Sequence, residues 1–155
     1  NKIGKSFNEE RGRSERMNIV VCVDDNGGML FNQRRQSRDK VLLEDMMNMV
    51  SSAGGKLWIA PFSEKMLQPY RENRPFITVD EAFLEKADAP DYCFVENESL
   101  QQWKEKIDAV IVYRWNRMYP ADTYFDIDLS GWQLISADEF PGSSHEKITK
   151  EVYIK

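Results

Sequence analysis

The sequence is poor in the residues that build metal centres and disulfide frameworks. Its 155 residues include one histidine, His145, and two cysteines, Cys22 and Cys93. A zinc hydrolase built on clustered ligands needs about three or four such side chains, so this class of enzyme is excluded and we expect no bound metal. Neither cysteine belongs to a Cys-x-x-Cys pair, and both lie in apolar, strand-like runs. This pattern predicts two buried, reduced thiols.

Long apolar runs and phosphate-binding motifs are also absent. No segment approaches the roughly 20 apolar residues of a membrane-spanning helix, and no hydrophobic stretch typical of a signal peptide precedes Ile19. The formal net charge of −5 disfavours nucleic acid or an anionic membrane as an electrostatic partner. No phosphate-binding loop and no Gly-x-Gly-x-x-Gly motif occurs. We therefore expect a cytoplasmic protein that binds neither membranes nor nucleic acid, and the sequence does not indicate its oligomeric state.

The first 16 residues differ in composition from the remainder. Residues 1–16 hold five basic and three acidic side chains, and Met17 then opens directly into an apolar run. We interpret residues 1–16 as a flexible leader, either a tag remnant or the product of an upstream start, and Met17 as the natural start. A genuine flexible arm is the alternative. Residues 17–155 have the length of a single domain.

Strand-like and helix-like segments alternate through this domain. Apolar runs predict buried strands over residues 19–23, 56–60, 92–95 and 108–115. Helices are predicted over residues 38–52, with Ser37 as the N-cap, and over residues 63–70, 78–87 and 98–106. Alternating polarity predicts an antiparallel pair over residues 132–140 and 147–154. This order predicts an α/β three-layer sandwich with a mostly parallel central sheet and an antiparallel C-terminal hairpin.

One stretch of this pattern is similar to a known family. In residues 90–132, a buried strand, a short helix and another strand lead to Asp122-Thr-Tyr-Phe125 and then to Trp132. This spacing resembles dihydrofolate reductase, and weaker matches at Val23-Asp24 and at residues 79–82 extend the resemblance over residues 17–155. The resemblance implies a dihydrofolate reductase-like fold for the domain.

The resemblance also implies the position of a catalytic carboxylate. The reductase needs this group beside the pterin ring, because hydride transfer to a C=N bond requires that a proton be delivered nearby. That carboxylate lies at the beginning of the family's first helix. Asp39 matches it with a one-residue gap, and an unbroken count gives Asp45. Asp39 is thus the candidate catalytic residue. The alternative is that Asp39 only offsets the dipole at the start of a helix.

The cofactor elements of the family are altered in this chain. Glu96 and Asn97 stand at the position of the family's glycine pair, where backbone amides face the dinucleotide. Residues 61–63 replace its Gly-Arg-x-Thr run, and the segment over residues 71–78 is shortened. These changes predict that the chain does not bind NADPH with an affinity useful to an enzyme.

Four arginines are the candidate ligand-binding residues. Arg34, Arg35 and Arg38 cluster at the junction between a loop and a helix, and Arg34-Arg35 replaces the family's Pro-Trp. Arg74 falls near the arginine that holds the folate carboxylate in the family. Guanidinium groups of this kind bind anions, although a solvated charged loop is the alternative.

Two functions follow from these observations. The first is a reductase-like protein without reductase activity that binds a small anionic ligand or a protein partner in the ancestral substrate cleft. The second is an active NADPH-dependent reductase of a pterin or related heterocycle. A Ser-His-Asp triad is not expected, because Ser143, Ser144 and His145 lie together in a predicted turn.

Overall fold

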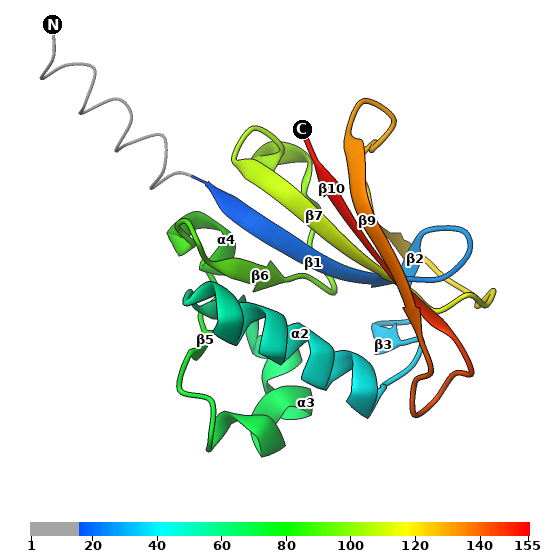
Figure 1. Cartoon of the computed structure of the whole chain (residues 1–155), viewed down its shortest axis with the longest axis horizontal. Coiled ribbons are helices and arrows are strands. Elements are labelled where there is room, and N and C mark those ends of the chain that lie inside the picture. The colour runs from blue at the N-terminus through cyan, green and yellow to red at the C-terminus, as the bar shows by residue number, and fades with distance from the viewer. Residues whose placement is uncertain (1–15) are drawn as a thin grey trace, which may run out of the picture.

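A seven-stranded sheet forms the centre of the molecule. The structure, a computed structural model, describes residues 16–155; the predicted leader, residues 1–16, lies outside this range except for Arg16, and its interpretation stays a prediction. In spatial order the strands are β5 (Ile77–Val79), β4 (Leu57–Ile59), β6 (Tyr92–Phe94), β1 (Met17–Val23), β7 (Ile107–Arg114), β10 (Ile148–Ile154) and β9 (Gln133–Phe140). The first five are mutually parallel, and β10 runs antiparallel to both β7 and β9 (Figure 1).

Helices cover both faces of this sheet. Helices α2 (Lys40–Ala53) and α3 (Pro61–Arg71) pack on the face that carries Val20 of β1. The short helix α4 (Phe83–Lys86) packs on the face that carries Ile19 and Val21. Both faces of β1 are therefore buried, as is usual for a central parallel strand. The predicted α/β three-layer sandwich with its antiparallel C-terminal hairpin is confirmed.

A second, three-stranded sheet lies beside the main one. Its order is β3 (Arg34–Arg35), β2 (Gly28–Phe31) and β8 (Thr123–Tyr124). Asn32 and Gln33 join β2 to β3 with φ values of 50° and 62°, the signature of a two-residue type I′ hairpin turn. The sequence predicted an irregular arginine-rich loop here. Strands of two and four residues are too short to show a recognisable alternation of apolar and polar side chains. The sequence pattern therefore did not predict the hairpin.

Several predicted helix boundaries are wrong. Helix α2 begins at Lys40 with Asp39 as its N-cap, not Ser37, because the Asp39 carboxylate accepts the backbone N–H of Leu42. The helix predicted over residues 98–106 is only a single 3₁₀ turn, η1 (Gln101–Trp103). Just before this turn, the backbone N–H of Leu100 donates to the carboxylate of Asp126. The helix predicted over residues 78–87 is reduced to α4.

The outer strand β9 has an irregular pairing with β10. Val152 pairs with Ser136 and Tyr153 pairs with Leu134, so Ile135 has no partner in the register. Leu134 and Ile135 are both exposed. This extra residue is a β-bulge at the edge of the sheet.

Candidate functional site

The predicted substrate cleft lies at the carboxyl ends of β6, β1 and β7, next to the beginning of α2. Its walls include Cys22 near the end of β1, Glu96 after β6, the N-cap residue Asp39, Leu42 of α2, and Trp115 after β7. The remaining space has a volume of about 20 Å³. A cavity of this size holds at most a single water molecule, so the side chains of the chain itself fill the cleft.

Glu96 closes one side of this cleft. Its carboxylate accepts two N–H groups of Arg35, at 2.6 Å from Nε and 2.8 Å from Nη2, and the hydroxyl of Ser63 at 2.6 Å. The side chains of Arg35 and Glu96 are 20% and 10% exposed. Arg35 also donates to the carbonyl of Phe62 and stacks over its ring at 4.8 Å. A two-point charged pair of this kind, shielded from water, is a strong link between β3 and the end of β6.

Asp39 is buried at the N-terminus of α2. Its carboxylate accepts the N–H of Leu42, and both the N–H and the hydroxyl of Ser144, at 2.7 to 3.0 Å. Burial raises the pKa of this carboxyl, but the hydrogen bonds from Ser144 and Leu42 outweigh that effect and lower the pKa to about 2. Asp39 is therefore ionised at neutral pH and serves as a helix cap. Its catalytic role stays a prediction of the reductase alternative.

Asp45, the other candidate for that carboxylate, lies further along α2. It accepts the hydroxyl of Tyr113 at 2.5 Å and lies 2.9 Å from Nζ of Lys150. These partners belong to β7 and β10. Asp45 therefore links α2 to the antiparallel end of the sheet and does not line the cleft.

Ser144 and His145 form a hydrogen-bonded chain with Asp39 and Tyr119. The Ser144 hydroxyl lies 2.8 Å from Asp39 and 2.7 Å from Nδ1 of His145, whose Nε2 lies 2.7 Å from the hydroxyl of Tyr119. Because the serine proton goes to Asp39, His145 must donate to Ser144 and cannot act as its base. In a Ser-His-Asp triad the aspartate bonds to the histidine, whereas here Asp39 bonds to Ser144. The residues are therefore close together but do not form a triad.

Cys22 lies beside the two carboxylates of the cleft. Burial raises the pKa of its thiol well above the ordinary value, Glu96 and Asp39 raise it further, and Arg35 opposes them. The thiol therefore stays protonated and is a poor nucleophile. Cys22 and Cys93 are both free, and only Cys93 is fully buried. The prediction of two unbonded thiols is confirmed, and the prediction that both are buried is wrong for Cys22, which is partly exposed.

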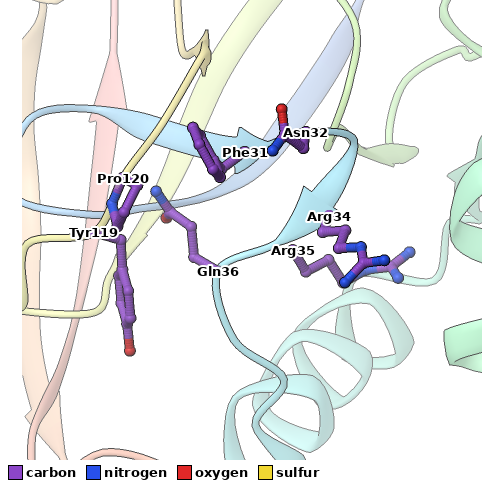
Figure 2. A pocket seen from close by; sticks show the side chains of 7 residues that line it. All are labelled: Phe31, Asn32, Arg34, Arg35, Gln36, Tyr119 and Pro120. Carbon is purple, nitrogen blue, oxygen red and sulfur yellow. The ribbon is translucent and has the colours of Figure 1, made fainter.

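An open pocket of about 590 Å³ lies outside the cleft, along the β2–β3 hairpin. Its walls consist of Phe31, Asn32, Arg34, Arg35, Gln36, Tyr119 and Pro120. Figure 2 shows the ring of Phe31 on one side of the hairpin and the two arginines extending from β3 away from it. Phe31 is 44% exposed and Arg34 is exposed. A pocket of this volume is the size of typical small-molecule sites.

Asp24 organises the walls of the open pocket. This fully buried carboxylate accepts the N–H of Gly28 at 2.8 Å, Nε2 of Gln36 at 3.1 Å and the N–H of Tyr119 at 3.1 Å. One carboxylate thereby holds β2, the segment after β3 and the segment after β7 next to one another. Sequence reasoning missed Phe31, Gln36 and Tyr119 as pocket residues, because long-range pairing brings them together. The sequence analysis used Asp24 only in the match of Val23-Asp24 to dihydrofolate reductase and did not predict its role in the pocket.

The four candidate arginines do not form one site. Arg34 lines the open pocket, Arg35 lies between the pocket and the cleft, and Arg38 is exposed at the cleft rim. Arg74 is separate, because it pairs with Glu44 of α2 at 2.7 Å and stacks on Tyr70. Their roles in ligand binding stay a prediction.

Two further properties of residues 16–155 concern metals and membranes. Within this part of the chain, no three His, Cys, Asp or Glu side chains converge so as to hold a metal ion. None of the helices described here has the length and apolar character needed to span a bilayer.

Comparison with solved structures identifies the architecture. The chain is similar to dihydrofolate reductase from Enterococcus faecalis, solved in complex with NADP(H) and RAB-propyl, with a TM-score of 0.63 over 91% of this chain and 96% of that one. The fold is that of dihydrofolate reductase. The two sequences are only 11% identical, so the likeness to dihydrofolate reductase concerns the fold alone. No protein-family model matches this chain, and no curated protein matches it.

Proposed function

We propose that this protein has the dihydrofolate reductase fold without the reductase activity, and that it binds a small anionic ligand in the open pocket. The observation that carries the first part is the bond between Arg35 and Glu96. It puts a carboxylate where the resemblance implies a glycine pair facing the dinucleotide. A phosphate-rich ligand would meet a side chain and a charge of the wrong sign there. The residues present therefore do not fit NADPH.

The second part of the proposal rests on one residue pair of the β2–β3 hairpin. Phe31 of β2 pairs with Arg34 of β3, and both side chains are exposed and line the pocket. The pocket wall therefore includes an exposed aromatic ring and an exposed guanidinium. A ligand with a planar aromatic part and a carboxylate or phosphate group matches this pair, through stacking and a charge-assisted hydrogen bond.

Isothermal titration with NADPH and NADP⁺ at low salt tests the first part. We expect no binding in the micromolar range, since about 1–2 kcal/mol of repulsion per contact weakens binding roughly tenfold each. Micromolar or tighter binding, together with turnover of dihydrofolate, would instead establish an active reductase with Asp39 beside the substrate.

A thermal-shift screen of aromatic carboxylates and aryl phosphates tests the second part. For compounds that stabilise the protein, Arg34→Ala and Phe31→Ala should each weaken binding by about tenfold or more. Arg38→Ala is the matched control, because it removes an equal, exposed charge at the rim of the cleft. Equal losses in Arg34→Ala and Arg38→Ala would mean that only the general charge of this face attracts the ligand, and would refute a specific pocket site.

A further inference from the structure

We propose that binding of an anion in the open pocket is coupled to protonation of His145, and that Tyr119 carries this coupling. The inference rests on the proposed function, because the anion is the ligand assigned to the open pocket, and it adds a dependence of that binding on pH. His145 is the single histidine of the chain. Histidine is the side chain whose ordinary pKa lets it change charge between pH 5 and 8.

His145 contacts the pocket through the side chain of Tyr119. It is buried beside this residue, which forms part of the pocket wall, and the two rings meet edge to face with their centroids 6.0 Å apart. In Figure 2 the Tyr119 side chain extends from the wall next to Pro120 and ends in its hydroxyl. That hydroxyl lies 2.7 Å from Nε2 of His145. A change of charge on His145 therefore acts directly on one wall of the pocket.

In the neutral state, the hydrogen bonds of His145 have a defined direction. The Ser144 hydroxyl donates to Asp39 at 2.8 Å and accepts the hydroxyl of Ser37 at 3.1 Å. Nδ1 of His145 lies 2.7 Å from the Ser144 oxygen, so it must carry a hydrogen and donate it. Because a neutral imidazole has one donor and one acceptor nitrogen, Nε2 accepts the hydroxyl hydrogen of Tyr119.

Protonation reverses the bond between His145 and Tyr119. An imidazolium donates from both nitrogens, so the Tyr119 oxygen becomes the acceptor and its own hydrogen must turn away from His145. Among residues 16–155, no second acceptor lies within hydrogen-bond distance of that hydroxyl. The hydrogen then points to solvent or to an acceptor atom of a bound ligand. An anion in the pocket favours this state both as an acceptor and as a counter-charge.

The groups around His145 decide when it becomes charged. Burial lowers its pKa below the ordinary value of 6.5, the Arg117 guanidinium lowers it further, and the Asp39 carboxylate opposes them. Trp115 stacks on the His145 ring at 4.8 Å and adds a cation–π contact once the ring is charged. Two exposed charged side chains follow in the sequence, Glu146 and Lys147. His145 is therefore mostly neutral at pH 7 without a ligand, and an anion bound nearby raises its pKa.

Anion binding and proton binding are then linked equilibria. If protonation of His145 strengthens anion binding, a bound anion strengthens proton binding by the same factor. A charge added at the pocket wall is only partly screened within a Debye length of about 8 Å. We expect the affinity for a monovalent aromatic anion to rise about three- to tenfold as the pH falls from 8 to 5.

Isothermal titration with 1-naphthoate between pH 8 and pH 5 measures this rise, because the carboxylate of the probe stays ionised over the range. The NMR signal of the single histidine gives the pKa of His145 with and without the probe. We expect 1-naphthoate to raise that pKa by the logarithm of the affinity ratio. Constant affinity with an unchanged pKa would overturn the coupling and leave the pocket site intact. Absence of binding at every pH would refute the pocket site and the coupling with it.

Two variants identify the group that titrates. His145→Gln keeps a neutral side chain that donates and accepts hydrogen bonds, and it should bind 1-naphthoate equally well at pH 5 and pH 8. Arg34→Ala is the matched control, which should bind more weakly at both pH values and keep the rise. A rise that persists in His145→Gln would show that another group titrates and would overturn the proposal.

Tyr119→Phe tests the route through the hydroxyl without any ligand. The variant keeps the ring in the pocket wall and removes the oxygen that accepts a hydrogen bond from charged His145. Hydrogen bonds from ionised groups are about twice as strong as neutral ones, so we expect the pKa of His145 to fall in this variant. The same NMR titration measures it, and an unchanged or raised pKa would overturn the role given to Tyr119.

Discussion

Gly142 lies so close to Asp39 that a β-carbon at residue 142 would come within 2.4 Å of the Asp39 carboxylate oxygen Oδ2. The same β-carbon would lie 2.6 Å from Cδ1 of the buried Ile148. The turn between β9 and β10 thus approaches the N-terminus of α2 as closely as glycine allows. Ser143 and Ser144 of this turn add hydrogen bonds to Lys40 and Asp39.

Replacing this glycine should destabilise the protein. We expect Gly142→Ala to lower the free energy of unfolding by about 1–3 kcal/mol, because the methyl group displaces a hydrogen-bonded carboxylate. Urea unfolding followed by tryptophan fluorescence measures the effect. Gly131→Ala is the control, since its β-carbon would meet no atom within 4 Å. Equal stability of the two variants would show that the turn adapts without cost.

The pH dependence of stability should report the Asp39 cap. The folded-state pKa of about 2 lies below the ordinary value of about 3.8, so the ionised cap stabilises the folded state above about pH 4. This contribution is lost as the pH falls through about 2, and integration of the shift gives about 2 kcal/mol. Asp39→Asn should therefore be less stable than the wild type at pH 7 and nearly as stable at pH 2. A difference that is constant from pH 7 to pH 2 would contradict the assigned ionisation.

The hairpin turn offers a stabilising substitution. Gln33 has a φ of 62°, a conformation that disfavours side chains with a β-carbon. Gln33→Gly should raise the free energy of unfolding by about 0.5–1 kcal/mol, because Asn-Gly is the preferred type I′ sequence. Gln33→Ala keeps the strain and should be close to neutral. Thermal unfolding of the three proteins checks this, and a loss of stability in Gln33→Gly would mean that the Gln33 side chain makes a compensating contact.

The two thiols should react at different rates in the native protein. Cys93 has no exposed surface and should resist iodoacetamide until the protein unfolds. Cys22 is partly exposed, but its raised pKa keeps it protonated, so its alkylation should be slow near pH 7. Mass spectrometry of labelled Cys22→Ser and Cys93→Ser proteins separates the two. Fast labelling of Cys93 would show that β6 opens readily.

Local sequence patterns predicted the sheet well because its strands are defined by apolar side chains on both faces. The runs at β1 and β7, and the alternation at β9 and β10, needed no knowledge of distant partners. The ends of helices were less predictable, since Asp39 and Asp126 decide them through contacts with particular backbone N–H groups. The β2–β3 hairpin was missed because two- and four-residue strands carry too little pattern.

The candidate site was only partly predictable for a related reason. The arginine cluster was visible in the sequence, and so was the replacement of the glycine pair by Glu96 and Asn97. The bond between Arg35 and Glu96 joins residues 61 positions apart, and no local pattern relates them. The open pocket likewise depends on Asp24 holding Gln36 and Tyr119 together.

The bulge at Ile135 has a consequence for contacts between molecules. An edge strand with a regular row of free N–H and C=O groups is a template on which another chain can add a strand, and this is a route to aggregation. In β9 the extra residue interrupts that row, and Asp138 and Glu139 add charge along it. The opposite edge strand, β5, is only three residues long. Both borders of the sheet are therefore poor templates for polymerisation, even though β9 exposes Leu134 and Ile135 to solvent.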